Sequence, residues 1–464
     1  MEAKEPLDFE KEDQLLNATP RKRRKVIGLD DLLTDYYEAI NKVVDCKPKN
    51  KSFCKGYNSD EDEKTQRKKE RMLSKFVENC EKQVNEMNTE DEIPLWNQRL
   101  FGQQKSPPLF ESMSLSNCQL LQFPSVGDLD SVFQCNAGQE ECFLEGLLVN
   151  RWLAKLTFIS GHVEDSVANW VFHKLLYSPN EDIEDAACEF WCDILLSKDE
   201  ADKPLVSLGW FPNYHKLMEA LESYGYMADM FDSHLTSSKE AQPADCLEGP
   251  PRNISSWIKF LCLCCQIRSY HQSIFSKSEA EELLSIIIHL VLDRQLQGLL
   301  LTLNECMQSM IGYFREDEWD ASCEKVARSV VSRIPNDINS LRILECISVT
   351  NNRSKHLRSQ IALQFLILHF GEKVNSHREV LEFLLSVNMK EKGCDFLKIY
   401  IYLVLVENSL LCHPPREDLV LTDLWCKYLQ NCSTQITSTD WRSYASKVRS
   451  KASYILQSTT QRNC

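Results

Sequence analysis

Apolar side chains recur at helical spacing through most of the chain after about residue 140. In the clearest stretch they fall on one face of an α-helix at these positions: Leu296, Leu299, Leu300, Leu303, Met307, Met310, Ile311 and Phe314. The run before it, 283–292, is apolar almost all round, which is typical of a helix covered on most sides. Further helices are predicted at 163–177, 183–197, 213–230, 253–270, 319–333, 337–348, 355–370, 377–387, 393–411, 418–430 and 438–456.

Residues that favour helix N-termini and prolines that interrupt helices separate these stretches. Ser276, Asp337 and Asp440 stand where N-cap residues are expected, and prolines such as Pro212 and Pro335 lie between stretches. Helices recur about every 20 residues, or about 40 per hairpin, which is the size of a HEAT-like unit. We therefore expect an all-α fold, an irregular HEAT-like α-solenoid of stacked helical hairpins over 140–464, after an extended N-terminal segment. An irregular helical bundle fits the spacing nearly as well, because no residue-level repeat is visible.

Residues 1–25 are polar and charged, and we expect them to form a disordered arm. The arm ends in five adjacent cations that repel one another and resist burial: Arg21, Lys22, Arg23, Arg24 and Lys25. Such a run in an accessible arm predicts a nuclear import signal, and hence a nuclear protein. A solvated run without function and a direct contact with nucleic acid are the alternatives.

Residues 26–139 are expected to form a partly ordered docking segment with short helices. Its beginning, 26–45, predicts an amphipathic helix, with a strand added to a small modifier such as SUMO as the alternative. Prolines interrupt the later part, whose apolar side chains are candidate docking anchors: Leu95, Trp96, Leu100, Phe101, Leu109 and Phe110. Apolar residues in an extended segment usually dock on a surface, which here is either the chain's own body or a partner's.

Three hydroxyl side chains lie in patterns that protein kinases use. Ser59 precedes four acidic residues, which suits an acidophilic kinase, although a plain acidic linker has the same composition. Ser106 and Thr19 each precede a proline, and both are candidate proline-directed phosphorylation sites.

The net charge argues against general nucleic-acid binding. Lys and Arg number 53 against 68 Asp and Glu, so the formal charge is −15, and phosphate is repelled outside any local basic patch. The alternative function is a helical solenoid that binds nucleic acid directly through such a patch. Its candidate residues are Arg353, Lys355, Arg358, Lys447, Arg449 and Lys451.

Glycine is scarce and scattered, at 14 residues with no two closer than Gly138 and Gly146. This spacing excludes a P-loop, a Rossmann fingerprint and a GxSxG nucleophile elbow, all of which need clustered glycines. No other spacing of residues indicates a catalytic nucleophile, acid or base, so we expect neither an enzyme nor a cofactor. The longest strongly apolar run, 399–406, has eight residues, whereas a membrane span needs about 20.

Cysteine is abundant, at 20 residues. The charged N-terminus has no apolar signal-peptide region, so we expect reduced, mostly buried thiols. Cys188 and Cys192 share one helix face, and Cys262, Cys264 and Cys265 continue an apolar helix. Each group, the second with His271, has a metal-binding alternative, but core packing is the interpretation that helix geometry favours.

Four stretches together resemble a known family: 25–33 (KVIGLDDLL), 93–97 (IPLWN), 170–173 (WVFH) and 187–191 (ACEFW). The chain resembles the C-terminal half of the second localisation factor of the Smc-five/six complex, a family related in architecture to the Nse-six subunit of yeasts. The resemblance covers most of residues 26–460 and rests on a helical body without a signature motif.

The resemblance implies a nuclear, non-enzymatic, α-helical scaffold without catalytic residues. Its C-terminal half is expected to pair with an Nse-five-like helical partner, such as the localisation factor with BRCT and ankyrin modules. The pair is then expected to bring the Smc-five/six complex to damaged or viral DNA, so that DNA contact is mainly indirect. Family members are typically longer, with a large disordered N-terminal arm, whereas about 25 such residues are present here.

Overall fold

The computed structural model describes most of the chain from Trp96 onward. The described residues are 96–110, 118, 137–198, 203–227, 249–267, 274–371, 374, 376–391, 393–412, 418–437, 439–440 and 442–462. The chain divides into two compact units, Met1–Gln83 and Val84–Cys464, and every described residue lies in the second. The predicted arm 1–25 and the beginning of the predicted docking segment therefore lie outside the described residues.

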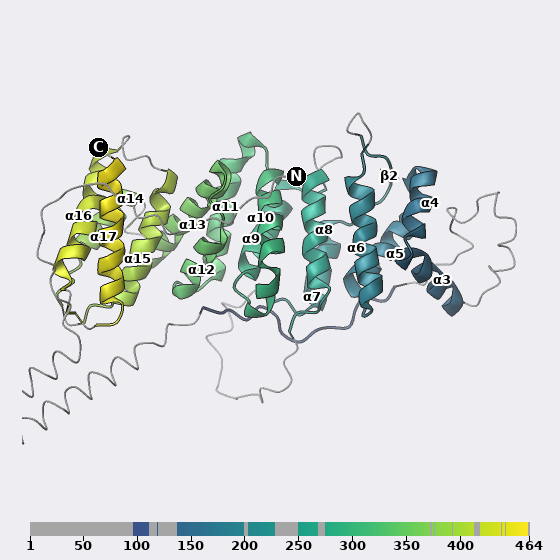
Figure 1. The fold of residues 1–464 in the computed structure, drawn as a ribbon, viewed down its shortest axis with the longest axis horizontal. Helices are drawn as coiled ribbons and strands as arrows, with labels where there is room; N and C mark the ends of the chain where they lie inside the picture. The colour runs from purple at the N-terminus through teal and green to yellow at the C-terminus, as the bar shows by residue number, and fades with distance from the viewer. Residues whose placement is uncertain are drawn as a thin grey trace, which may run out of the picture. The chain divides into compact units, whose positions relative to one another are not determined.

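The described residues form fifteen α-helices in chain order (Figure 1). Their bounds are α3 Ala137–Val149, α4 Trp152–Ser160, α5 Asp165–Tyr177, α6 Glu181–Leu196, α7 Tyr214–Ser223, α8 Ile254–Gln266, α9 Lys277–Leu290, α10 Leu300–Tyr313, α11 Glu316–Arg333, α12 Ile338–Cys346, α13 Asn352–Phe370, α14 His377–Ser386, α15 Phe396–Ser409, α16 Leu419–Gln435 and α17 Ala445–Arg462. Two 3-10 helices, η7 Arg294–Leu299 and η9 Leu410–Cys412, adjoin them. Two two-residue strands, β1 His162–Val163 and β2 Ser207–Leu208, pair in parallel.

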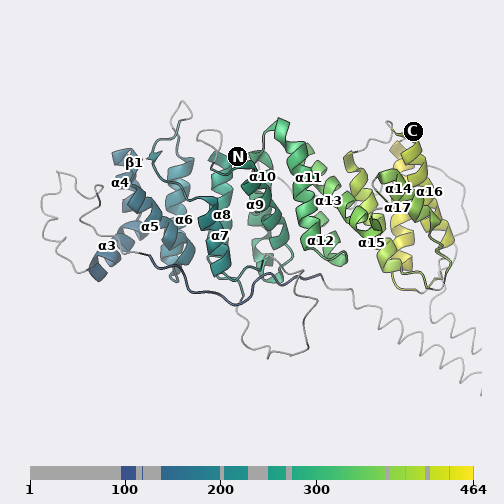
Figure 2. The same ribbon diagram turned by 180° about the vertical axis from the view of Figure 1, so that it is seen from behind.

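Helices that are close in the sequence pack on one another. One series of contacts runs α6–α8–α10–α13–α15–α17. Further contacts join α5 to α6, α9 to α11 and α14 to α16. Figures 1 and 2 show the same succession from α3 to α17 from opposite sides. Because each helix covers the apolar face of its neighbours, this arrangement confirms the predicted all-α, irregular HEAT-like solenoid.

The caps and the core follow from local sequence. Ser276 forms a capping box with Glu279 at the start of α9, and Asp337 accepts the Asn339 amide at the start of α12. The apolar run 283–292 is buried as predicted, and each Leu or Ile side chain there contributes about 1.5–3 kcal/mol.

Three predicted helices have different limits in the structure. The stretch 213–230 forms a helix only to Ser223, because Gly225 has a φ of +83° and the following residue pairs with Phe101. The last helix begins at Ala445 rather than 438, because Tyr444 has a left-handed φ of +60°. The stretch 296–314 starts as the 3-10 helix η7 before α10 continues it.

Part of the predicted docking segment packs on the helical body. Residues 96–110 contain no helix and contact the helices, although 26–139 was expected to include short helices. The body therefore includes an extended segment from within the predicted docking segment.

Among the described residues, no single helix is long and apolar enough to cross a membrane. One bent pair of helices, Lys277–Leu290 with Arg294–Tyr313, has together the length and composition of a membrane span.

Candidate functional site

Residues 96–110, called the strap below, form an extended segment across the ends of several helices. Figure 1 draws the strap as a dark blue trace along one edge of the helical array. Its contacts begin on α12 and α11 and end on α5, so its direction is opposite to the chain order of the helices. The strap contains five of the six candidate docking anchors: Trp96, Leu100, Phe101, Leu109 and Phe110.

Trp96 lies between two guanidinium groups. The Cζ atoms of Arg342 and Arg294 lie 4.5 and 5.2 Å from the centre of its indole ring. Arg294 Nε also donates a 2.9 Å hydrogen bond to the Trp96 carbonyl. Cation–π contacts contribute about 0.5–1 kcal/mol each at exposed sites. Two residues along the strap, the main-chain amide of Gln98 donates a 3.0 Å hydrogen bond to the Leu292 carbonyl, which helps to fix the direction of the strap.

Leu100 and Phe101 are fully buried. The Leu100 amide donates a 3.1 Å hydrogen bond to Oδ2 of Asp293, a buried carboxylate whose other oxygen caps η7. The Leu100 carbonyl accepts from the Met227 amide at 2.9 Å. Phe101 forms an antiparallel bridge with Tyr226, and their ring centres are 5.8 Å apart. The strap thus contributes to the core as a short strand-like segment.

A close backbone approach follows this bridge. The Gly102 amide donates to the Gly225 carbonyl at 2.8 Å, and the Lys105 amide donates to the Ser223 carbonyl at 2.8 Å. A Cβ atom on Gly225 would lie 2.7 Å from the Gln103 carbonyl oxygen. Position 225 therefore requires glycine both for its positive φ and for the passage of the strap.

The end of the strap rests on α5. The Phe110 ring lies 4.5 Å from the His173 ring, which also donates a hydrogen bond to the Pro108 carbonyl. Burial lowers the pKa of His173. Leu109, in contrast, is fully exposed, and none of residues 104–110 is fully buried, whereas Leu100 and Phe101 in the middle of the strap are. The end of the strap is therefore held by fewer apolar contacts than its middle.

The structure thus distinguishes between the two surfaces considered for the anchors. Trp96, Leu100 and Phe101 dock on the chain's own body, while Leu95 lies outside the described residues. Sequence reasoning missed the groups that hold them, above all Asp293. The available signal was an acidic residue directly after the almost uniformly apolar run 283–292.

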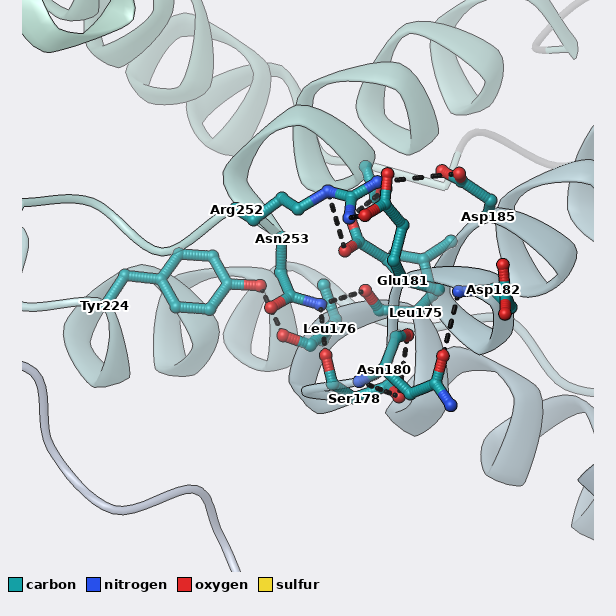
Figure 3. Close-up of polar contacts among 12 residues, drawn as sticks. Leu175, Leu176, Ser178, Asn180, Glu181, Asp182, Asp185, Tyr224, Arg252 and Asn253 are labelled. Atoms are coloured by element: carbon teal, nitrogen blue, oxygen red, sulfur yellow. Dashed lines mark hydrogen bonds and ion pairs between the residues drawn. The ribbon is translucent and has the colours of Figure 1, made fainter.

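A second polar junction joins the turn between α5 and α6 to the start of α8 (Figure 3). Asn253 Nδ2 donates to the Leu175 carbonyl at 3.2 Å and to the Ser178 carbonyl at 3.1 Å. Tyr224 Oη donates to the Leu176 carbonyl at 2.7 Å. These donors satisfy carbonyls that the end of α5 leaves without helical partners, so the junction fixes the angle between successive hairpins.

In the same junction, Arg252 lies close to three acidic side chains from the first turns of α6. Its guanidinium pairs with Glu181 and lies 3.5 Å from Asp185 Oδ2 (Figure 3). It also lies 3.8 Å from Glu184 Oε2. Glu184 is buried and accepts a 2.6 Å hydrogen bond from Ser256 Oγ. Burial nevertheless raises the pKa of the Glu184 carboxyl group.

This raised pKa predicts how stability depends on pH. Between its unfolded pKa and its higher native pKa, Glu184 binds more protons in the folded state, so the free energy of unfolding falls as pH rises through that interval. Glu184→Gln should remove this dependence and raise stability at pH 7 by up to about 1 kcal/mol. Chemical denaturation from pH 4 to 8 measures both effects. The control Glu181→Gln removes an exposed partner of Arg252 and should change stability by less than about 0.5 kcal/mol. Parallel pH profiles for wild type and Glu184→Gln would contradict the prediction.

The cations proposed for nucleic-acid binding are used partly inside the fold. Arg353 donates to main-chain carbonyls at the end of α10, and Arg358 donates to Asn408 Oδ1 at 2.6 Å. Lys451 pairs with Glu407 at 2.7 Å. These three side chains therefore support packing, which leaves fewer cations for a phosphate backbone. The other candidates are Lys355, Lys447 and Arg449.

The thiols considered as metal ligands lie in or beside the core. Cys188, Cys264 and Cys265 are buried, as core packing predicts, and Cys192 and Cys262 are half-buried. A hydrogen bond from Cys188 to Cys192 holds the pKa of Cys188 above its usual value and that of Cys192 below it. Within the described residues, no group of three or more His, Cys, Asp or Glu side chains is placed to hold a metal ion, and His271 lies outside them.

A cavity of 460 Å³ lies beside the loop between α14 and α15. Its lining includes Met389, Cys394, Lys398, Tyr402 and Tyr428. The volume falls in the range of small-molecule sites, about 300–1,000 Å³, and also suits a side chain of a partner protein.

Helix α4, at the end of the described array, exposes apolar side chains. Trp152 is 54% exposed and Ile159 is 72% exposed, and by helical spacing both lie on the side away from the buried Ala154 and Thr157. Lys155 lies between them, with its Nζ atom 4.6 Å from the Trp152 ring centre. We call Trp152, Lys155 and Ile159 the α4 face. Terminal units of solenoids normally show a polar outer surface, so this face is a candidate partner contact.

The structure leaves several predicted sites outside the described residues, among them the basic run 21–25 and Ser59. Ser106 is described and exposed. A scan of the chain against protein-family models found no match, and a search of curated proteins found no relative.

Proposed function

We propose that the chain is a nuclear, non-catalytic scaffold of the DNA damage response. Its helical body pairs with an Nse-five-like helical partner, and the pair recruits the Smc-five/six complex to DNA lesions or foreign DNA. The observation that carries the scaffold role is the α-solenoid with the α4 face exposed at one end of the described array. The resemblance of four sequence stretches supports the identity of the partner and the complex.

The resembling stretches that the structure describes lie mainly in the core. Trp170 and Phe172 on α5 and Trp191 on α6 are buried, with the Phe172 and Trp191 rings 5.1 and 5.3 Å from that of Phe260. These residues support the shared architecture of the body. Partner binding must therefore be tested with surface residues, and the α4 face is the first choice because burying Trp152 and Ile159 would gain the most apolar contact.

Nuclease-treated affinity purification of the tagged chain from nuclear extract tests the proposal. We expect an Nse-five-like partner and Smc-five/six subunits in amounts comparable to the bait by mass spectrometry. The double variant Trp152→Ala/Ile159→Ser should reduce partner recovery about tenfold or more, because such anchors often contribute at least 2 kcal/mol to binding. A matched control, Leu419→Ser/Val420→Ser, changes exposed apolar residues at the start of α16 and should leave recovery unchanged.

The same purification separates the proposal from direct nucleic-acid binding. If the soluble, nuclear wild-type chain recovers none of these proteins, the scaffold role in this complex is wrong. Binding of duplex DNA at low salt that weakens steeply with added salt would then favour the alternative.

A further inference from the structure

Ser106 lies in the loosely held half of the strap and is accessible. It is exposed, belongs to neither helix nor strand, and is followed by Pro107, so it can be presented in the extended form that protein kinases bind. The chain contains another described Ser-Pro pair, at Ser178. Ser178 is buried in the turn after α5, where its Oγ donates to the Asn180 carbonyl. In the structure, a kinase can therefore reach Ser106 but not Ser178.

The surroundings of Ser106 are unfavourable for added negative charge. The neighbouring Lys105 amide donates to the Ser223 carbonyl, which belongs to the last residue of α7. The C-terminal end of a helix carries the negative end of its dipole. Two exposed carboxylates, Glu219 and Glu222, lie within the same last turn. A phosphate on Ser106 would therefore lie beside the negative end of α7, whose last turn also carries these two carboxylates.

Two cations on α5 and α7, the helices that the end of the strap contacts, have other partners. Lys174 pairs with Glu141 and with Glu145, and Lys216 donates to Asn169. Lys105 belongs to the strap itself, so its attraction to a phosphate moves with the strap and does not hold it to α7. The charge of Lys174 is thus compensated by two carboxylates. Lys216 keeps its charge because its partner is neutral, so the dipole of α7 and the two carboxylates of its last turn must outweigh this one cation to oppose docking.

We propose that Ser106 is the target of a proline-directed kinase and that its phosphate releases strap residues 104–110 from α7 and α5. In the transfer, Ser106 Oγ forms a bond to the γ-phosphorus of a nucleoside triphosphate while the bond to the bridging β–γ oxygen breaks. The nucleoside diphosphate leaves, and the hydroxyl proton passes to the kinase's base. The added charge of about −2 repels the end of α7.

The release is local because the two halves of the strap are held differently. Leu100 and Phe101 are fully buried and keep the first half in place. In the second half, Phe110 leaves the His173 ring, which uncovers an aromatic surface on α5. Phosphorylation thereby changes one surface of the scaffold without unfolding it.

The test treats the full chain, in a Thr19→Ala background, with a purified proline-directed kinase and magnesium ATP. A free peptide of residues 100–112 confirms that the kinase accepts the sequence. Intact-protein mass and fragment mapping should place one phosphate on Ser106 and none on Ser178, and Ser106→Ala should abolish it. Hydrogen exchange resolved to single amides should become about tenfold faster at Lys105 and stay unchanged at Gly102.

A further double variant tests the cause of the release. Glu219→Gln/Glu222→Gln should restore much of the protection at Lys105 in the phosphorylated chain, because it removes the repelling carboxylates. Phosphorylation of the peptide but not of the full chain would overturn the proposal. Modified Ser106 with unchanged or slower exchange at Lys105 would overturn it equally.

Discussion

Phe101→Ala is expected to lower the free energy of unfolding by about 3–5 kcal/mol, the usual cost of truncating a buried phenylalanine. The side chain is fully buried and packs against Tyr226, so its removal leaves a cavity between the strap and the helices. The loss should also free the strap, because Phe101 lies between its two sets of backbone hydrogen bonds. Chemical denaturation measures the first effect, and limited proteolysis within 96–110 measures the second.

A matched control lies in the same strap. Leu109 is fully exposed, so Leu109→Ala removes apolar area without opening a cavity and should change stability by less than about 0.5 kcal/mol. If both variants lose similar stability, or if Phe101→Ala is as stable as wild type, the strap is not part of the core.

Acidification from pH 7 to pH 5 is expected to cost about 2 kcal/mol of stability through His289 alone. Burial, with a smaller contribution from Arg333, lowers the pKa of His289 to about 3, while the unfolded residue has a pKa of about 6.5. Between these values the unfolded state binds more protons, so stability falls as pH decreases. Above pH 7 both states are neutral at this residue, and the contribution is constant.

Denaturation of wild type and His289→Gln at pH 5 and pH 7 measures this contribution. Glutamine keeps a polar group near Tyr226 Oη, which lies 3.3 Å from His289 Nδ1, and does not titrate. The difference between the two proteins should therefore be about 2 kcal/mol smaller at pH 5 than at pH 7. His215→Gln, which replaces an exposed histidine, serves as the control. An unchanged difference would show that His289 is not neutral in the native state at pH 5.

Helical spacing predicted the body well because each helix is determined mainly by local residues. Ser276 and Asp337 cap the helices that their positions indicated, and the apolar stretch 283–292 is buried. The end of α7 was predicted too late because the deciding interaction, between Phe101 and Tyr226, joins residues far apart in the sequence. Local patterns contain no information about such pairings.

The candidate site was predictable only in part for the same reason. The apolar character of Trp96, Leu100 and Phe101 indicated docking, but not the surface on which they dock. That surface depends on Asp293, Arg294 and Arg342, and their positions in the sequence do not say which segment they contact. Likewise, the sequence shows only that Arg353 and Arg358 are positively charged. In the structure their guanidinium groups donate hydrogen bonds to the Phe314 carbonyl and to Asn408 Oδ1.

The strap also has a consequence for synthesis of the chain. Gln98 bonds to the carbonyl of Arg333, 235 residues later, whereas the solenoid otherwise relies on contacts between nearby helices. At translation rates of about 5–20 residues per second, the strap leaves the ribosome roughly 10–50 seconds before the end of its docking surface exists. The helices from α3 onward can fold in succession during that time. The partners of Phe101 and Leu100, Tyr226 and Asp293, are also made long after the strap, so these two apolar side chains stay exposed on the nascent chain until those residues have been synthesised.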